Sequence, residues 1–474
     1  MSKKNNMIRK AFLLPIFFLI FLTSKPFDSN ARQYNSLYWM KGIPQSSYGN
    51  PALAPQPNFF IGLPVISSLS LNMSNRGFMI GDVLRLDMYN EYYWDNDNLL
   101  NQLKPNNHFH GSLHVDLLSF GLRHKDSYFI FQVTDRVELN VGYTADMAYL
   151  LVKGSDAYPS NMLPGDFIGL GTDYHHYREY AASYTRDWSP AITTGIRGKI
   201  LAGLAHTAVN YESMHLQTDP SDGKRKLHAD ILVNSSNTSI PRILKGEELD
   251  DGHFANSSHA VDYLTNSNNL GAAIDLGMII RPTPSLHLGF SILDIGFIDW
   301  KEQAEHVRIT GASDFSGIDL QDMFEGGFAE NFLNHADTIS YDFDLVALEG
   351  SYRQTLSPRI IASAAIDLSQ RHQLALLTQG FYYNDRLYPS ASISYYARPS
   401  HAFGIIMSYT VANMNYTNIG FGFNLNLGPL QLYAVSDNVL AAIQPYKTQL
   451  ATLHLGMNLV FGYRPQSGRP LHGW

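Results

Sequence analysis

The sequence predicts an all-β chain that folds as a transmembrane antiparallel β-barrel of about 14 strands. Three observations predict this fold: long runs of apolar and polar alternation, an N-terminal export signal, and the lack of any later apolar run of 18 residues. Residues 418–428 alternate best, with apolar side chains at the odd positions and Asn or Gly between them, and residues 452–463 nearly repeat the pattern. Each run is about the ten residues that a tilted strand needs to cross a bilayer, whereas strands of soluble proteins typically have about 5 to 6.

Residues 1–31 have the features of a secretory signal peptide. Lys3, Lys4, Arg9 and Lys10 precede a twelve-residue apolar stretch, and the small residues before Arg32 form a cleavage site. A retained membrane anchor is the alternative, but a spanning helix needs about 20 apolar residues. The chain has no Cys, so no lipoprotein anchor is expected after the apolar stretch. The mature chain is expected to begin near Arg32.

Composition excludes several classes of function. Removing residues 1–31 takes five basic residues from 34 and one acidic residue from 42, which leaves 29 against 41 and a net charge of −12. This balance argues against nucleic acid as a partner. Without Cys, disulfides and thiolate metal sites are unavailable. The mean hydropathy of −0.15 is low for a membrane protein, but a barrel exposes only alternate residues to lipid and keeps a polar interior.

Strand parity predicts which residues face lipid and which face the interior. Phe421, Phe423, Leu455 and Leu459 share the apolar parity and should face lipid, whereas Asn424 and Asn458 should face inward. The other predicted strands place six charged residues on the inward parity: Asp116, Glu138, Arg197, Lys199, Asp275 and Arg281. These residues either line a charged pore or pair with one another to fill a closed barrel. Both alternatives keep charge away from lipid, where a midplane Arg or Lys costs about 2–4 kcal/mol.

The pattern divides the chain into four parts. After the signal peptide of residues 1–31, residues 32–64 are rich in Pro and Gly and are expected to form a plug inside the barrel. The barrel should occupy residues 65–463, with a C-terminal tail at 464–474. Two stretches within the barrel, 217–269 and 301–340, are expected to be long loops, which face outward in such barrels. The second loop should include a helical insertion, because its apolar residues Leu320, Met323, Phe324, Phe328, Phe332 and Leu333 have helical spacing.

Histidines give one candidate metal site. His108, His110 and His114 share one face of a predicted strand, and three imidazoles could bind a metal. His108 and His114 are six residues apart, or about 20 Å along a strand, so one ion could not reach both. We therefore interpret this face as a hydrated inner wall and predict no metal or cofactor. His175 and His176 are expected on a surface loop.

No catalytic motif is present. The run GDFIGLG at 165–171 lacks the spacing of a dinucleotide or phosphate loop, and there is neither HExxH nor GxSxG. A Ser-His site assembled from separate strands would leave no such motif. We predict that the protein is not an enzyme.

Several segments carry a resemblance to a known family. They are GIPQSSYGNPALAPQPNFFIGLP near the mature N-terminus, RPTPSLHLGFSILDIGFIDW in the centre, and GPLQLYAVSDNVL with LGMNLVFGYRP near the C-terminus. Together they resemble an uncharacterised family of Bacteroidota outer-membrane proteins, classed as a domain of unknown function, which implies a barrel but no activity. Asn50-Pro51-Ala52 is also similar to the NPA element in the N-terminal hatch of long-chain fatty-acid transporter barrels, which have fourteen strands. A similar NPA occurs in barrels of the type IX secretion system.

We therefore expect a protein of the cell outer membrane, in contact with lipid and with the barrel assembly machinery that inserts it. The leading hypothesis is a channel for small apolar or amphipathic molecules, closed by the plug. The alternative is a non-conducting scaffold associated with protein secretion or surface machinery, whose partners would include secretion-system components.

Overall fold

The computed structural model describes residues 35–89, 91–154, 170–218, 225–238, 263–264, 268–313, 343–383, 386–412 and 415–463. The predicted signal peptide, the helical patch of the second loop and the C-terminal tail lie outside these residues. Among the described residues, no helix combines the length and the hydropathy needed to cross a membrane.

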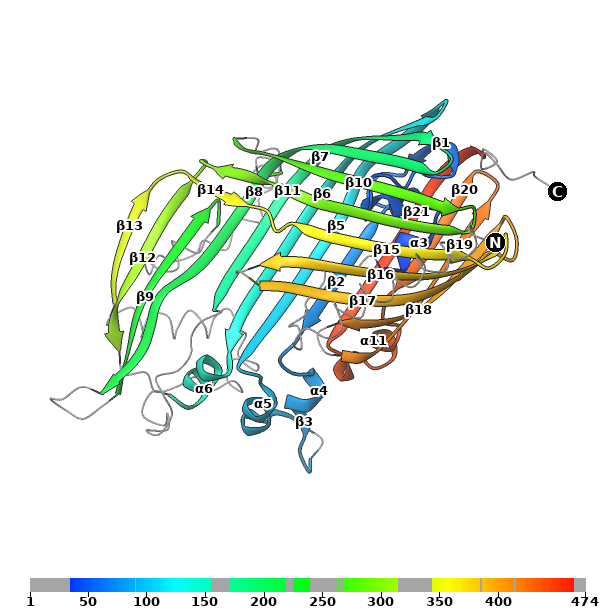
Figure 1. Ribbon diagram of the computed structural model, residues 1–474. Coiled ribbons are helices and arrows are strands. Elements are labelled where there is room, and N and C mark those ends of the chain that lie inside the picture. The colour runs from blue at the N-terminus through cyan, green and yellow to red at the C-terminus, as the bar shows by residue number, and fades with distance from the viewer. Residues whose placement is uncertain are drawn as a thin grey trace, which may run out of the picture.

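A closed ring of antiparallel strands forms the body of the molecule (Figure 1). Around the ring the strands are β1 (Pro57–Gly62) with β2 (Leu69–Asn75) in one position, then β5 (Asn106–His124), β6 (Ser127–Thr144), β7 (Gly171–Ser189), β8 (Ile192–Thr218), β10 (Asn269–Thr283), β11 (Leu286–Trp300), β14 (Tyr352–Thr355) with β15 (Arg359–Asp367) in one position, β16 (His372–Tyr383), β17 (Arg386–Ala397), β18 (Phe403–Ala412), β19 (Asn415–Leu427), β20 (Leu430–Ser436) and β21 (Leu450–Tyr463).

Closure comes from β21, which pairs with β20 on one side and with β1 and β2 on the other. The ring therefore has fourteen strand positions, and the predicted fold class and strand number are confirmed. Because each of the fourteen positions has a paired neighbour on both sides, the ring closes without a free edge.

The two ends of the barrel differ in their connections. At one end the strands are joined by turns at residues 125–126, 190–191, 284–285, 368–371, 398–402 and 428–429. At the opposite end two connections are short, from Tyr383 to Arg386 and from Ala412 to Asn415, but the others are long. The long ones include short elements (Figure 1): α4 (Ile80–Val83), β3 (Leu84–Leu86), β4 (Tyr92–Trp94), α5 (Asn96–Gln102), α6 (Ala145–Lys153), α11 (Leu440–Ile443) and η2 (Pro445–Lys447). Short turns are typical of the periplasmic end of bacterial barrels, and long loops of the outer end.

In the barrel wall, apolar side chains are exposed on the outside and polar side chains are buried inside, the reverse of a soluble protein. Phe421 and Phe423 are 42% and 38% exposed on the outside, whereas Asn424 and Asn458 are 2% and 0% exposed inside, as strand parity predicts. Along β6 every second residue is buried, and among these are Gln132, Thr134, Arg136, Glu138 and Asn140. A chain that buries polar groups and exposes an apolar band is adapted to an apolar solvent outside.

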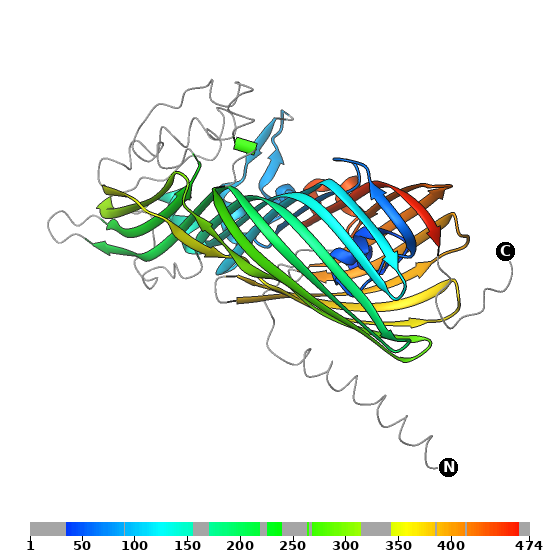
Figure 2. The same ribbon diagram turned by 90° about the horizontal axis from the view of Figure 1, so that it is seen from above.

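Three strands extend the wall at the long-loop end. The second half of β8 leaves β10 and pairs instead with β9 (Arg225–Ser236), which pairs with β12 (Ala304–Ser313), which pairs with β13 (Phe343–Glu349). Figure 2 shows this extension projecting beyond the ring. The predicted loops 217–269 and 301–340 are therefore partly strands. The first includes β9, where residues 227–234 already form a short strand-like run in the sequence. The second includes β12, which its pairing with β9 and β13 stabilises.

Other boundaries also differ from the prediction. Residues Pro57–Gly62 were assigned to the plug, but they form β1. Proline lacks a backbone N–H, but at the first residue of a strand this removes no hydrogen bond from the interior of the sheet. The barrel wall therefore begins at Pro57 and not at residue 65. The strand β7 carries His175, which the sequence placed on a loop; its mixed Tyr, His and Arg composition hides the period-2 pattern.

Candidate functional site

An N-terminal segment, residues 35–56, runs inside the ring of strands. It contains α3 (Asn35–Trp39) and the 3₁₀ helix η1 (Pro44–Tyr48), followed by the Asn50-Pro51-Ala52 turn. All five residues of α3 are buried, as are Asn50 and Ala52. In both Figure 1 and Figure 2 the segment lies among the strands of the ring. Its contacts with the wall determine whether the interior is open or filled.

The first half of this segment packs against an apolar strip of the inner wall. Leu37, Met40 and Ile43 are at most 2% exposed. With Tyr38 and Trp39 they form one cluster with wall residues of β11, β15, β16, β17, β18 and β20: Leu293, Ile361, Ala365, Ala375, Leu377, Tyr396, Ile406, Tyr433 and Val435. The interior of a wide barrel is usually polar, so this apolar strip is a distinctive property of this one.

A wall carboxylate holds the beginning of α3. The Asp437 carboxylate accepts hydrogen bonds from the backbone N–H groups of Ser36 (2.9 Å) and Asn35 (3.3 Å). It also accepts one from the Ser36 hydroxyl. The first N–H groups of a helix lack partners within the helix, and an anion there also interacts favourably with the helix dipole. Asp437 therefore caps α3 from the wall.

The Asn50-Pro51-Ala52 turn contacts the wall at β7, β8, β10 and β11. The Asn50 side chain accepts from Ala52 N (2.9 Å), which makes an Asx turn, and donates to Phe290 O (3.3 Å). Pro51 O accepts from the Thr185 hydroxyl at 2.6 Å. The wall has glycines where the turn touches it: a Cβ at Gly195 would lie 2.1 Å from Pro51 O, and one at Gly277 would lie 2.1 Å from Asn50 Oδ1. The absence of a side chain at these wall positions permits the contact.

The six charged residues predicted to face inward occupy different parts of the interior. Asp116, Glu138, Arg197, Lys199 and Asp275 are each at most 4% exposed. Glu138 lies 3.3 Å from His114, and Asp116 accepts from Thr134 at 2.9 Å. Arg281 lies near the short-turn end, where its guanidinium donates to the Thr193 hydroxyl at 2.8 Å. Arg197, Lys199 and Asp275 belong to one cluster.

This ion cluster has Lys199 at its centre. The Lys199 ammonium lies 2.6 Å from Asp294, 2.9 Å from Asp275 and 3.5 Å from Glu179. Arg136 on β6, Arg197 on β8 and Arg359 on β15 approach the same three carboxylates. Buried charges must be paired in this way, because an unpaired ion in the interior costs several kcal/mol. These side chains pair with one another and fill part of the barrel.

Two of the inward-facing charged residues contact the N-terminal segment. The Arg197 guanidinium donates to Ser47 O at 2.9 Å, and the Tyr48 hydroxyl donates to the Asp116 carboxylate. Burial raises the pKa of the Tyr48 phenol well above its usual range, and the Asp116 charge raises it further. Tyr48 therefore stays a neutral donor. Sequence parity placed Arg197 and Asp116 inward, but it could not show that both contact the segment.

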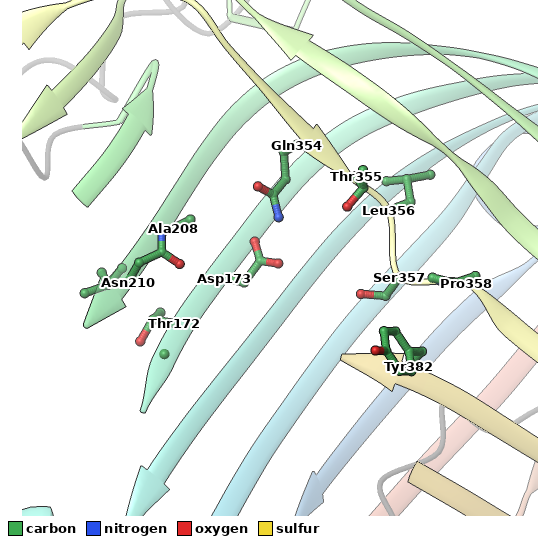
Figure 3. Close-up of a pocket in the computed structure, with 12 residues that line it drawn as sticks. Thr172, Asp173, Ala208, Asn210, Gln354, Thr355, Leu356, Ser357, Pro358 and Tyr382 are labelled. Carbon is green, nitrogen blue, oxygen red and sulfur yellow. The ribbon is translucent and has the colours of Figure 1, made fainter. Parts of the chain in front are cut away.

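A cavity of about 310 Å³ lies toward the long-loop end (Figure 3). It is bounded by the beginning of β7 and the middle of β8 on one side and by the link between β14 and β15 on the other. Its lining residues are Gly171, Thr172, Asp173, Ala208, Val209, Asn210, Gln354, Thr355, Leu356, Ser357, Pro358 and Tyr382.

The histidines predicted to share a strand face are buried but have separate partners. His110 is bonded to Asn140 at 2.9 Å, His114 lies beside Glu138, and the His108 ring stacks on Tyr388 with 5.3 Å between ring centroids. Among the described residues, the ligand atoms of Asp173, His175 and His206 do converge. Sequence patterns do not reveal this group, because the segment around His175 reads as a loop. The cross-strand pairing of His175 with His206 depends on the register between β7 and β8.

Comparisons with known proteins identify one matching family and several solved structures of low similarity. A family model described as "Family of unknown function (DUF5723)" matches residues 51–437. No curated protein matches the sequence. Similar solved structures include the Pseudomonas putida toluene transporter TodX, with 10% identity, a TM-score of 0.40, and coverage of 92% of this chain and 98% of that one.

Two further structures are similar to the same extent. The Ralstonia pickettii toluene transporter TbuX has 8% identity and a TM-score of 0.41, and a Pseudomonas aeruginosa FadL homologue has 10% identity and a TM-score of 0.42. Each match covers 88% of this chain and 94% of the other.

Proposed function

The chain belongs to the DUF5723 family of unknown function, and we propose that it is an outer-membrane channel for small apolar or amphipathic molecules. The observation that carries this proposal is the two-sided interior: an apolar strip on β11, β15–β18 and β20, and most of the buried charged groups on β5–β8, β10 and β11. An amphipathic molecule could contact both sides. The proposal includes no catalytic step.

Placement in the outer membrane is part of the proposal. The exposed apolar band on the ring supports it, because such a band has no favourable solvent except lipid. Partners that follow are outer-membrane lipid and the barrel assembly machinery.

The N-terminal segment acts as the plug in this proposal. Burying one apolar side chain contributes about 1.5–3 kcal/mol, so Leu37, Met40 and Ile43 together favour the closed position by about 5–9 kcal/mol. One hydrogen bond contributes only about 0.5–1.5 kcal/mol. The channel is therefore closed at rest, and removing a single polar contact would not open it.

Deletion of residues 33–56 tests the proposal. This deletion ends before β1, so every strand of the wall remains. We expect a barrel that still migrates as a folded species in unheated electrophoresis samples, and whose conductance in planar bilayers rises severalfold. Uptake of an apolar dye into vesicles should rise with it.

A second variant keeps the chain length: Leu37, Met40 and Ile43 are replaced together by Ser, which weakens the apolar packing alone. It should show a smaller rise in conductance. The matched control is Asp299→Ala, which breaks an ion pair with Arg353 on the outer part of the wall and should leave conductance unchanged. Unchanged conductance and uptake in both folded plug variants would overturn the channel proposal and favour the scaffold, for which co-purification with secretion-system components is the next test.

A further inference from the structure

Three potential metal ligands meet on the inner face of β7 and β8. Asp173 and His175 are two residues apart on β7, so they share a face, and His206 is the cross-strand partner of His175. Their exposed fractions are 5%, 4% and 0%. One ligand atom from each residue can be chosen so that all three lie within 4.8 Å of one another.

The distances fit a small metal ion. His175 Nε2 and His206 Nε2 lie 2.6 Å and 3.3 Å from the same Asp173 oxygen. Ligand atoms on a tetrahedral ion with bonds of about 2.0–2.1 Å are about 3.3 Å apart. The Asp173–His206 distance already has this value, and the Asp173–His175 pair would have to open by less than 1 Å.

Neighbouring side chains hold His206 in place. Its Nδ1 atom lies 2.8 Å from the Tyr352 hydroxyl, and its ring stacks on Trp300 with 5.0 Å between centroids. A metal-binding His usually uses its second ring nitrogen for a hydrogen bond, which sets its tautomer and orientation. Tyr352 and Trp300 come from β14 and β11, so His206 is oriented from across the interior.

We propose that Asp173, His175 and His206 bind a divalent transition-metal ion of the Zn²⁺ class. One carboxylate and two imidazoles, with no thiolate, suit such an ion better than Mg²⁺ or Ca²⁺, which prefer oxygen ligands alone. Asp173 also lines the 310 Å³ cavity (Figure 3). Three protein ligands beside a cavity leave a coordination position open to a water molecule or to a small donor molecule in the barrel.

The experiment uses the mature chain in detergent, purified without a polyhistidine tag and treated with a chelator. Isothermal titration with Zn²⁺ should give one tight site per chain, and Co²⁺ should give the visible absorption of a low-coordinate nitrogen and oxygen site. Asp173→Asn and His175→Gln/His206→Gln should lower the Zn²⁺ affinity by at least about 100-fold, and Tyr352→Phe by about 10-fold to 100-fold.

A second histidine pair provides the control. His215 and His228 stack at 5.0 Å between centroids on β8 and β9, so they could bind Zn²⁺ weakly. His215→Gln/His228→Gln should leave the tight site unchanged. Unheated electrophoresis verifies folding of every variant. Absence of a tight site in the folded wild type, or equal affinity in His175→Gln/His206→Gln, would overturn the proposal. Neither result depends on whether the barrel conducts.

Discussion

At the scale of residues, Lys199 shows how one side chain can hold together the charged part of the interior. Its ammonium lies within 3.5 Å of three buried carboxylates, those of Glu179, Asp275 and Asp294. Its partners lie on β7, β10 and β11, so one side chain links strands that are distant in sequence. The inward position of Lys199 follows from parity. Its partners do not, because three strand registers must be known to place them.

Replacing Asp294 by Asn should destabilise the barrel strongly, because Lys199 and the three arginines of the cluster would then share only two carboxylates. Breaking a buried ion pair by removing one partner costs about 3–5 kcal/mol, because the remaining charge stays buried. Urea unfolding in detergent or lipid vesicles, followed by tryptophan fluorescence, measures the change. The control is Arg308→Met on the exposed Arg308–Asp230 pair of β12 and β9, which should change stability little because water and salt screen that pair. Equal effects of the two substitutions would contradict the assigned role of the cluster.

At the scale of elements, the N-terminal segment and the barrel wall have complementary surfaces. The Asn50-Pro51-Ala52 turn rests on Gly195 of β8 and Gly277 of β10. The sequence identified the turn and the plug-like composition, but the matching glycines are about 145 and 225 residues away along the chain. Only the closed ring brings them to the turn.

Gly195→Ala should displace this turn. The added Cβ would lie 2.1 Å from Pro51 O and 2.4 Å from Ala52 N, so the backbone of the segment has to move. Gly198→Ala is the matched control on the same strand, because a Cβ there meets no atom within 4 Å. The chain has no Cys, so Ala52→Cys serves as the single reporter.

Labelling of that Cys by a small maleimide should become severalfold faster with Gly195→Ala and stay unchanged with Gly198→Ala. The same rate in all three proteins would mean that this contact does not hold the segment in place.

At the scale of the whole molecule, the apolar band predicts where the protein resides. It should fractionate with outer membranes, resist extraction at alkaline pH, and run as a heat-modifiable band, because lipid is the favourable solvent for its outer surface. Immunoblots of separated membrane fractions provide the measurement. Recovery of the folded protein in the soluble periplasm would contradict the membrane placement.

The sequence by itself determined the class of fold and the two faces of the wall. Alternation is a local property with a period of two residues, so it predicted the barrel and the inward positions of Asp116, Glu138, Arg197, Lys199 and Asp275. It failed where local composition hides the period, as in β7, and where pairing with neighbouring strands creates a strand, as in β12. Only the tertiary structure decided which residues meet across the interior. Ring closure and strand register bring together the ion cluster, the wall glycines that the Asn50-Pro51-Ala52 turn contacts, and the ligand atoms of Asp173, His175 and His206. These are relations between strands, which no single stretch of sequence specifies.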